Sequence, residues 1–143
     1  MKSINIVSLK MVKESSMKYT TRISSPADVA DLVSQYLDNA DRENFVVVCL
    51  DRKGEPTAIH TVSIGNLHSS IVHPREVFKV AVLSNSASII LAHNHPSGDP
   101  TPSTEDLKVT QRIKSAGEIL GIDVLDHIIV GDTNYSLDRH NQL

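Results

Sequence analysis

The sequence predicts one α/β or α+β domain, with helices and strands arranged around a single sheet. Its 143 residues are the length of one domain, and 40% hydrophobic with 22% charged residues is the composition of a soluble globular protein. Short apolar runs rich in β-branched residues alternate with segments whose apolar residues recur at helical spacing. No repeat, linker or low-complexity segment divides the chain, which favours one core.

Three segments have the spacing of amphipathic helices. Ser25 and Pro26 open the first, because serine caps helices and proline is favoured at the first helical position. The second is expected over residues 73–84. The third is expected from Ser103 to Gly121, a glycine of the kind that ends helices. Each has apolar residues on one face, so each is expected to pack on the sheet.

Short apolar runs bounded by charged or turn residues predict five strands, because β-branched side chains suit a pleated, buried surface. A loop containing three prolines follows the third of these strands, and a strand-like extension over residues 1–21 precedes a domain over residues 22–143. The strands are expected over residues 45–50, 57–64, 88–92, 124–130 and 135–137, with the proline-rich loop at 93–102.

The charge balance argues against a nucleic-acid-binding surface. Lysine and arginine total 14 against 17 aspartate and glutamate residues, which gives a net charge of −3, and no basic run stands out. Three tyrosines and two phenylalanines, without tryptophan, supply few rings on which bases could stack. DNA binding by this domain is therefore not expected.

Cysteine usage and hydropathy favour a cytoplasmic protein without a membrane partner. Cys49 is the only cysteine, so no internal disulfide can form, and its apolar strand favours an inert buried thiol. No apolar run approaches the ~18 residues that span a bilayer. Residues 1–10 lack the apolar stretch of a signal peptide. Self-association stays open.

Two histidines and one aspartate form a candidate metal site. His93 and His95 are two residues apart at the carboxyl end of a strand, so both imidazoles can face one point. Asp106 follows in the first turn of the next helix. Two imidazoles and one carboxylate, with a fourth position left to water, are typical of catalytic zinc. Alternatively, Ser103 and Asp106 only cap the helix, and the histidines are polar loop residues.

The same residues carry a family resemblance. His-x-His at 93–95 with Ser-x-x-Asp at 103–106 resembles the JAMM signature of the MPN⁺ metalloproteases. The string HNHPSGDPTPSTED, with HPREVFK at 73–79 and LDHIIVGD at 125–132, resembles the RadC family of bacterial JAMM proteins, over roughly residues 22–138. The resemblance implies a three-layer domain with a mixed central sheet, related to cytidine deaminases. It also implies one zinc ion per chain, held by His93, His95 and Asp106. The helix-hairpin-helix-like region of longer RadC chains has no counterpart in the first 22 residues.

The JAMM pattern also requires a glutamate at the start of a core strand, and Glu43 is the residue that fits. A general base there would take a proton from water and pass it to the leaving amine. Glu76 is the rival, although its surroundings indicate an exposed helix start; alternatively, Glu43 is a solvated charge. Ser103 would donate a hydrogen bond to the water or to the developing oxyanion, besides capping its helix.

These residues favour a zinc-dependent metallohydrolase that cleaves a peptide or isopeptide bond in a protein or peptide substrate. The alternative is a DNA repair-associated or DNA-binding factor without proteolysis. His127 is either a satisfied core histidine or a partner that orients the zinc ligands. Three further histidines are expected to be structural or at the surface: His60, His68 and His140.

Overall fold

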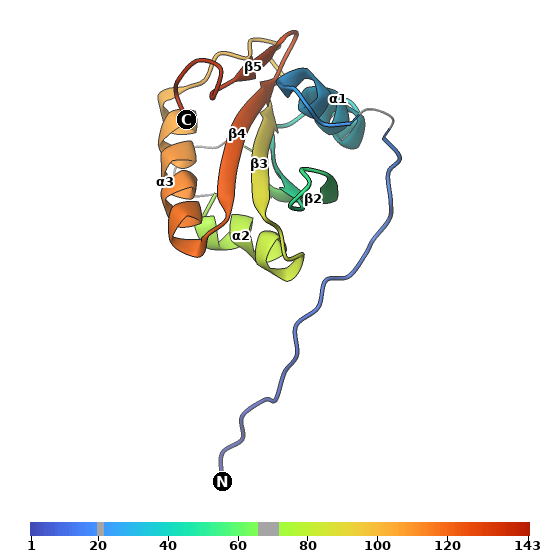
Figure 1. Cartoon of the computed structure of the whole chain (residues 1–143), viewed down its shortest axis with the longest axis vertical. Coiled ribbons are helices and arrows are strands. Elements are labelled where there is room, and N and C mark those ends of the chain that lie inside the picture. The colour runs from blue at the N-terminus through green and yellow to red at the C-terminus, as the bar shows by residue number, and fades with distance from the viewer. Residues whose placement is uncertain (20–21, 66–71) are drawn as a thin grey trace.

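A computed structural model describes residues 1–19, 22–65 and 72–143, and it shows one sheet with helices on both faces (Figure 1). Within these ranges the chain forms three helices and five strands. In chain order they are α1 (Pro26–Leu37), β1 (Asn44–Leu50), β2 (Pro56–Ile64), α2 (Pro74–Leu83), β3 (Ser88–Asn94), α3 (Thr104–Leu120), β4 (Asp123–Val130) and β5 (Asn134–Ser136).

The sheet is mixed, as the sequence resemblance implied. Its strand order is β2-β1-β3-β4-β5, with β3 and β4 parallel and the other neighbours antiparallel. A parallel pair needs a long crossover connection, and α3 makes that connection between β3 and β4. The loop between β3 and α3 places the first turn of α3 beside the end of β3, and α3 then returns the chain to the start of β4.

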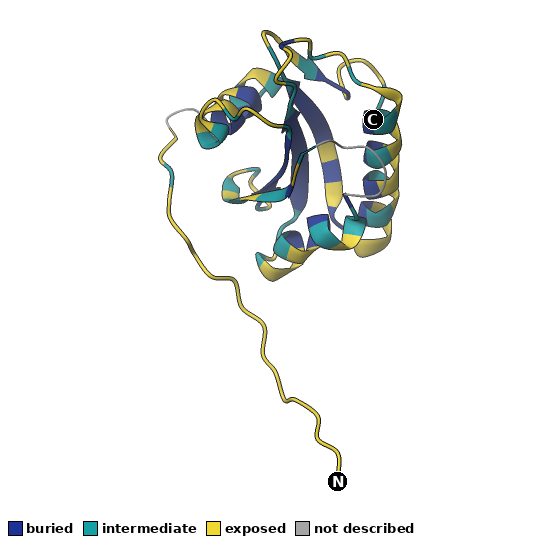
Figure 2. Cartoon of the chain, turned by 180° about the vertical axis from the view of Figure 1, so that it is seen from behind, coloured by how far each residue is buried: buried dark blue, intermediate teal, exposed yellow. Residues whose placement is uncertain are grey.

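The two faces of the sheet bury separate apolar clusters, which gives a helix–sheet–helix arrangement. On one face α1 packs through residues such as Val33 against Val46 and neighbouring even-numbered positions of β1. On the other face α2 and α3 pack against odd-numbered positions that include Phe45. Successive side chains of a strand point to opposite faces, and both faces of β1 are covered by helices. Every residue of β1 is therefore buried (Figure 2). The α+β fold class is confirmed.

The helices and strands lie within two residues of their expected bounds, and β3 is the informative difference. It was expected to end at residue 92 but continues to Asn94, because His93 still pairs with Phe45 of β1 and Ile129 of β4. His93 therefore belongs to the sheet and not to the loop. None of the helices in the described ranges is long and apolar enough to cross a membrane.

The strand expected within residues 1–21 does not form in residues 1–19, which run as an extended chain away from the domain (Figure 1). Alternating side chains do not make a strand unless a neighbouring strand accepts its backbone hydrogen bonds, and no strand pairing involves this segment. It meets the domain at its end, where Met17 packs on the α1 cluster and Gln35 donates to the carbonyl of Lys18. The domain boundary after residue 21 stays a prediction.

Candidate metal centre

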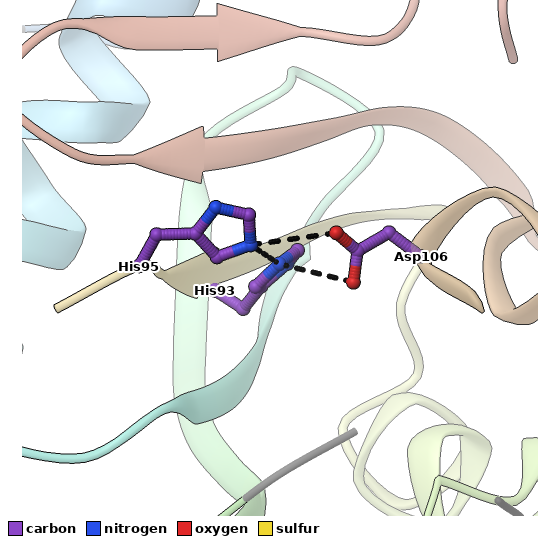
Figure 3. A group of neighbouring side chains, drawn as sticks. All are labelled: His93, His95 and Asp106. Carbon is purple, nitrogen blue, oxygen red and sulfur yellow. Dashed lines mark hydrogen bonds and ion pairs between the residues drawn. The ribbon is translucent and has the colours of Figure 1, made fainter. Parts of the chain in front are cut away.

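Three candidate ligands meet at the carboxyl end of β3 (Figure 3). His93 lies in β3, His95 follows its last residue, and Asp106 is in the first turn of α3. One ligand atom from each lies within 4.8 Å of the others. The His93 ring is fully buried and the Asp106 side chain is 3% exposed, whereas the His95 side chain is 13% exposed. Solvent therefore reaches the group from the His95 side.

The distances between these side chains suit a small cation. The Nε2 atoms of His93 and His95 are 2.8 Å apart, and each is 3.4 Å from a different carboxylate oxygen of Asp106. Ligand atoms about 2.1 Å from a tetrahedral zinc ion lie about 3.4 Å apart. The two histidine–carboxylate distances match that spacing, and the two nitrogens need to separate by about half an ångström.

Hydrogen bonding leaves the His95 Nε2 with a lone pair directed at the centre of this group. Its Nδ1 lies 2.8 Å from the carbonyl oxygen of Asp99, which can only accept, so Nδ1 carries the hydrogen. Neutral His95 then has no hydrogen on Nε2. A bare nitrogen facing a second imidazole and a carboxylate is repulsive unless a cation or a proton lies between them, so the donor set fits a metal ion.

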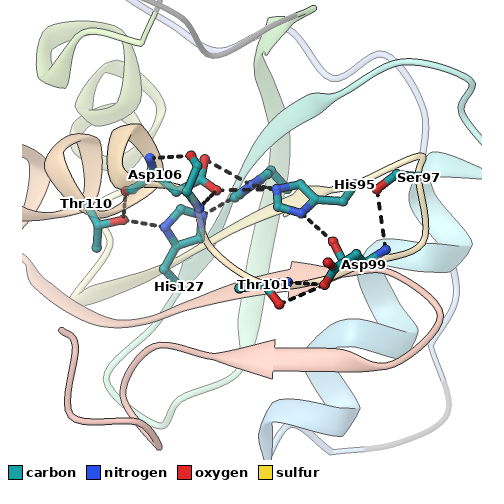
Figure 4. A network of polar contacts seen from close by, with 9 residues as sticks. His95, Ser97, Asp99, Thr101, Asp106, Thr110 and His127 are labelled. Atoms are coloured by element: carbon teal, nitrogen blue, oxygen red, sulfur yellow. Dashed lines mark hydrogen bonds and ion pairs between the residues drawn. The ribbon is translucent and has the colours of Figure 1, made fainter.

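The loop that carries His95 is bound to the turn between β4 and β5. The His95 amide donates to the Val130 carbonyl (2.8 Å), and the Asp132 amide donates to the Gly98 carbonyl (2.7 Å). Gly98 has a φ of +94°, and a Cβ at this position would meet the Asp132 carboxylate at 2.5 Å. Within the loop, Asp99 accepts hydrogen bonds from both the amide and the hydroxyl of Thr101 (Figure 4). These contacts fix the Asp99 carbonyl that orients His95.

Asp106 both caps α3 and faces the two histidines. The Ser103 amide donates to its Oδ2 (2.8 Å), and its own amide donates to the Ser103 hydroxyl (3.1 Å), which is the expected capping box. Burial alone would raise the Asp106 pKa. Positive charge beside the carboxylate, on His93 when that ring is protonated, and the hydrogen bonds from Ser103 outweigh burial, however, and lower the pKa well below its usual range. The ionised Asp106 carboxylate is therefore both the helix cap and a candidate metal ligand.

His127 is a buried histidine in direct contact with a candidate ligand. Its Nε2 lies 2.7 Å from Nδ1 of His93, and its Nδ1 lies 2.5 Å from the hydroxyl of Thr110 (Figure 4). Burial lowers the pKa of His127 well below its usual value, so the ring is neutral. The sequence alone leaves its role open and does not single out Thr110. Thr110 follows Asp106 by four residues and so shares its helix face, which is a signal that could have identified it.

The predicted general base is Glu43. It precedes β1 and is half-buried, and it is not one of the three clustered ligands. Phe45 pairs with His93 and its ring stacks on the imidazole at 6.1 Å between centroids. Glu43 comes two residues before Phe45, at the end of β1 that lies beside the carboxyl end of β3. Its role as a base stays a prediction.

Asn94, between the two histidines, ties β3 to the residues on either side of Glu43. Its side-chain oxygen accepts from the Asn44 amide (2.7 Å), and its side-chain nitrogen donates to the Arg42 carbonyl (2.9 Å). The Glu43 carbonyl itself accepts from the Gly65 amide (2.7 Å). The backbone that carries the predicted base is thus held directly by the segment that carries the predicted ligands.

The other candidate residues that the structure describes are not part of the ligand cluster. Glu76 forms a surface ion pair with Lys79 (2.8 Å) in the first turn of α2, as expected for an exposed helix start. Cys49 is buried, and burial raises the pKa of its thiol, which agrees with an inert core position. His60 and His140 are exposed, as expected. His68 lies outside the described residues.

Comparison with known proteins gives matches across the domain. The family model described as RadC-like JAB domain matches residues 23–143. A UPF0758 protein of Desulforamulus reducens is 56% identical over 114 residues, which cover 80% of this chain and 50% of the relative. A UPF0758 protein of Rubrobacter xylanophilus is 54% identical over 121 residues, covering 85% of this chain and 53% of the relative. The chain spans about half the length of these relatives.

The match covers all five predicted site residues, from Glu43 to Asp106, and the complete helix–sheet–helix domain. Its residues 23–143 nearly coincide with the segment over which the sequence resembles RadC proteins. The resemblance is confirmed, and the chain belongs to the RadC-like JAB domain family.

Proposed function

We propose that this chain is a zinc-dependent metallohydrolase that cleaves a peptide or isopeptide bond. The convergence of His93, His95 and Asp106 carries the proposal, because two imidazole nitrogens and an ionised carboxylate face one point at the end of β3. Imidazole ligands favour zinc over magnesium or calcium, which prefer all-oxygen sites. When bound, zinc polarises a carbonyl and makes water nucleophilic at neutral pH.

Glu43 is the proposed general base and acid. Its carboxylate would take the proton from the attacking water and give it to the leaving amine nitrogen, so that one amide bond is exchanged for an acid and an amine. The backbone contacts through Asn94 support this role, because they couple the position of Glu43 to the end of β3. Glu43 is half-buried, so a substrate could reach its carboxylate.

Ser103 is the proposed donor to the developing oxyanion. Its hydroxyl oxygen accepts from the Asp106 amide, which leaves the hydroxyl hydrogen free to donate elsewhere. Ser103 is exposed and adjoins the ligand-bearing first turn of α3. An incoming carbonyl can therefore approach it from solvent.

Metal analysis joined to an unbiased peptide-cleavage screen tests the proposal. We expect one zinc per chain and cleavage that stops when a chelator removes the metal. The His93→Ala, His95→Ala double variant should lose the zinc. Glu43→Gln should keep the zinc and lose cleavage, whereas Glu118→Gln, an exposed control on the last turn of α3, should keep both. Full zinc occupancy in the double variant would refute the metal site, and zinc loss in Glu43→Gln would make Glu43 a ligand.

A DNA-directed role would instead require a positively charged surface. With a net charge of −3, the domain should bind duplex DNA weakly, and the binding should weaken steeply as salt rises. Fluorescence anisotropy with a labelled duplex at low and physiological salt measures this. Tight, sequence-selective binding at physiological salt would favour the DNA-binding alternative.

A further inference from the structure

We infer that His127 and Thr110 are positioning residues that fix the tautomer of His93, so that neutral His93 presents a hydrogen-free Nε2 to the metal site. The inference rests on the proposed function for its purpose and on buried hydrogen bonds for its mechanism. All three side chains belong to residues with no solvent exposure. They form a series of hydrogen bonds from Thr110 through His127 to His93, and water therefore cannot replace any partner in it.

The series begins at the backbone of Asp106. The Thr110 hydroxyl lies 2.8 Å from the Asp106 carbonyl oxygen, one helical turn earlier. A carbonyl oxygen only accepts, so the single hydroxyl hydrogen of Thr110 is committed to this bond. The Thr110 oxygen can then act only as an acceptor toward its other neighbour.

That neighbour is Nδ1 of His127, at 2.5 Å. Because Thr110 accepts, His127 must carry its hydrogen on Nδ1, and the neutral ring has a lone pair on Nε2. His127 Nε2 lies 2.7 Å from His93 Nδ1, so His93 must supply the hydrogen of that bond. His93, when neutral, then has a bare Nε2, the atom that faces His95 and Asp106.

The series thus links two of the three candidate ligands. The backbone of Asp106 orients Thr110, Thr110 orients His127, and His127 orients the ring of His93 (Figure 4). His95 reaches the same tautomer more simply, by donating directly to the carbonyl of Asp99. Groups that hold a ligand ring in this way typically change metal affinity by about 10–100-fold when they are removed.

The test compares His127→Phe, which keeps a ring beside Phe45 but removes the acceptor, with Thr110→Val and Thr110→Ser. Thr61→Val is the matched control, since Thr61 lies in β2, separated from β3 by β1, and its hydroxyl hydrogen-bonds the Tyr36 hydroxyl. Long-range ¹H–¹⁵N spectra of the metal-free protein report which nitrogen of His93 carries hydrogen. Competition against a chromophoric chelator reports the affinity for Zn²⁺.

We expect wild-type His93 to be the Nδ1–H tautomer, and His127→Phe to show Nε2–H or a mixture with Zn²⁺ binding weakened about 10–100-fold. Thr110→Val should show a smaller loss in the same direction, Thr110→Ser should restore both readouts, and Thr61→Val should match the wild type. If His127→Phe fails to melt cooperatively, the comparison of Thr110→Val with Thr110→Ser tests the inference.

An Nε2–H tautomer in wild-type His93, or folded variants with unchanged tautomer and Zn²⁺ affinity, would overturn the inference. Failure of the wild type to bind Zn²⁺ would instead refute the proposed function, because the tautomer of metal-free His93 is read without metal.

Discussion

Helices α1 and α3 begin with the same four-residue motif, Ser-x-x-Asp, and form the same capping box. In α1 the Ser25 amide donates to the Asp28 carboxylate (3.0 Å), and the Asp28 amide donates to the Ser25 hydroxyl (3.4 Å). In α3 the Ser103 and Asp106 bonds measure 2.8 and 3.1 Å. Both serines are in the extended conformation that precedes a helix.

The two aspartates differ in what lies beyond the cap. The Asp28 carboxylate accepts further hydrogen bonds from the amide and hydroxyl of Ser24, at the surface. The Asp106 carboxylate is nearly buried, with one oxygen toward each of His93 and His95. Local sequence therefore makes the cap in both helices, and the position of α3 at the carboxyl end of β3 makes the second cap a candidate metal ligand.

The largest contrast should come from removing the aspartate charges. Asp106→Asn replaces an ionised candidate ligand by a neutral amide, so we expect loss of most bound zinc. Asp28→Asn should leave the zinc content at the wild-type level, because its carboxylate accepts hydrogen bonds from Ser24 and Ser25 and is not part of the ligand cluster. Metal analysis after dialysis measures both. Equal zinc content in the two variants would mean that the two caps do not differ in function.

The second contrast concerns turnover on a peptide that the wild type cleaves. Asparagine also caps helices but places its polar atoms farther from the backbone, so Ser103→Asn should melt near the wild type and keep zinc. Its rate should fall by roughly 10²–10³ if Ser103 donates to the oxyanion. Ser25→Asn, the matched control, should leave both rate and melting unchanged. Normal turnover in Ser103→Asn would leave Ser103 as a cap alone.

A smaller and equal effect is expected from deleting both caps. Ser25→Ala and Ser103→Ala each remove a side chain that accepts a backbone hydrogen bond at a helix start. Each should cost about 0.5–2 kcal/mol of stability in urea unfolding of the metal-free protein. Metal-free conditions separate the cap from the candidate ligand. A loss confined to one helix would show that the two capping boxes are not energetically alike.

Most of this architecture follows from local patterns in the sequence. Apolar periodicity and the capping serines predict the three helices, because burial and capping act within a few residues. The spacing of His93, His95 and Asp106 predicts the ligand cluster, because strand alternation places the histidines together and the helix begins at the end of a stiff loop.

The contacts that the sequence analysis missed all depend on packing between distant segments. Thr110 and His127 meet only because α3 crosses over to β4, and their separation of 17 residues has no period that marks it. Asn94 bonds to residues about 50 positions earlier because β1 and β3 pair. Conversely, alternation at the N-terminus suggested a strand that does not form, since pairing is not encoded in alternation.

The smallest effect is the pH dependence of the α1 cap, which isolates a capping aspartate from metal binding. Hydrogen bonds from the Ser24 amide and hydroxyl, and then from Ser25, hold the Asp28 pKa below its usual value. A carboxyl group whose pKa is lower in the folded state stabilises the fold above the unfolded pKa of about 3.9. That stabilisation is lost as the pH falls through the folded value.

Wild type should therefore melt above Asp28→Asn at pH 6, and the difference should shrink as the pH falls below about 4. Once Asp28 is protonated it is as neutral as asparagine, and the two proteins then differ little in charge. Thermal melts of the metal-free proteins from pH 6 to 2.5 measure the difference. A melting difference that grows on acidification would have the wrong sign for a carboxylate stabilised by its helix. The capping box of α1 would then be stabilised by something other than the negative charge of Asp28, the charge that Asp106 carries in α3.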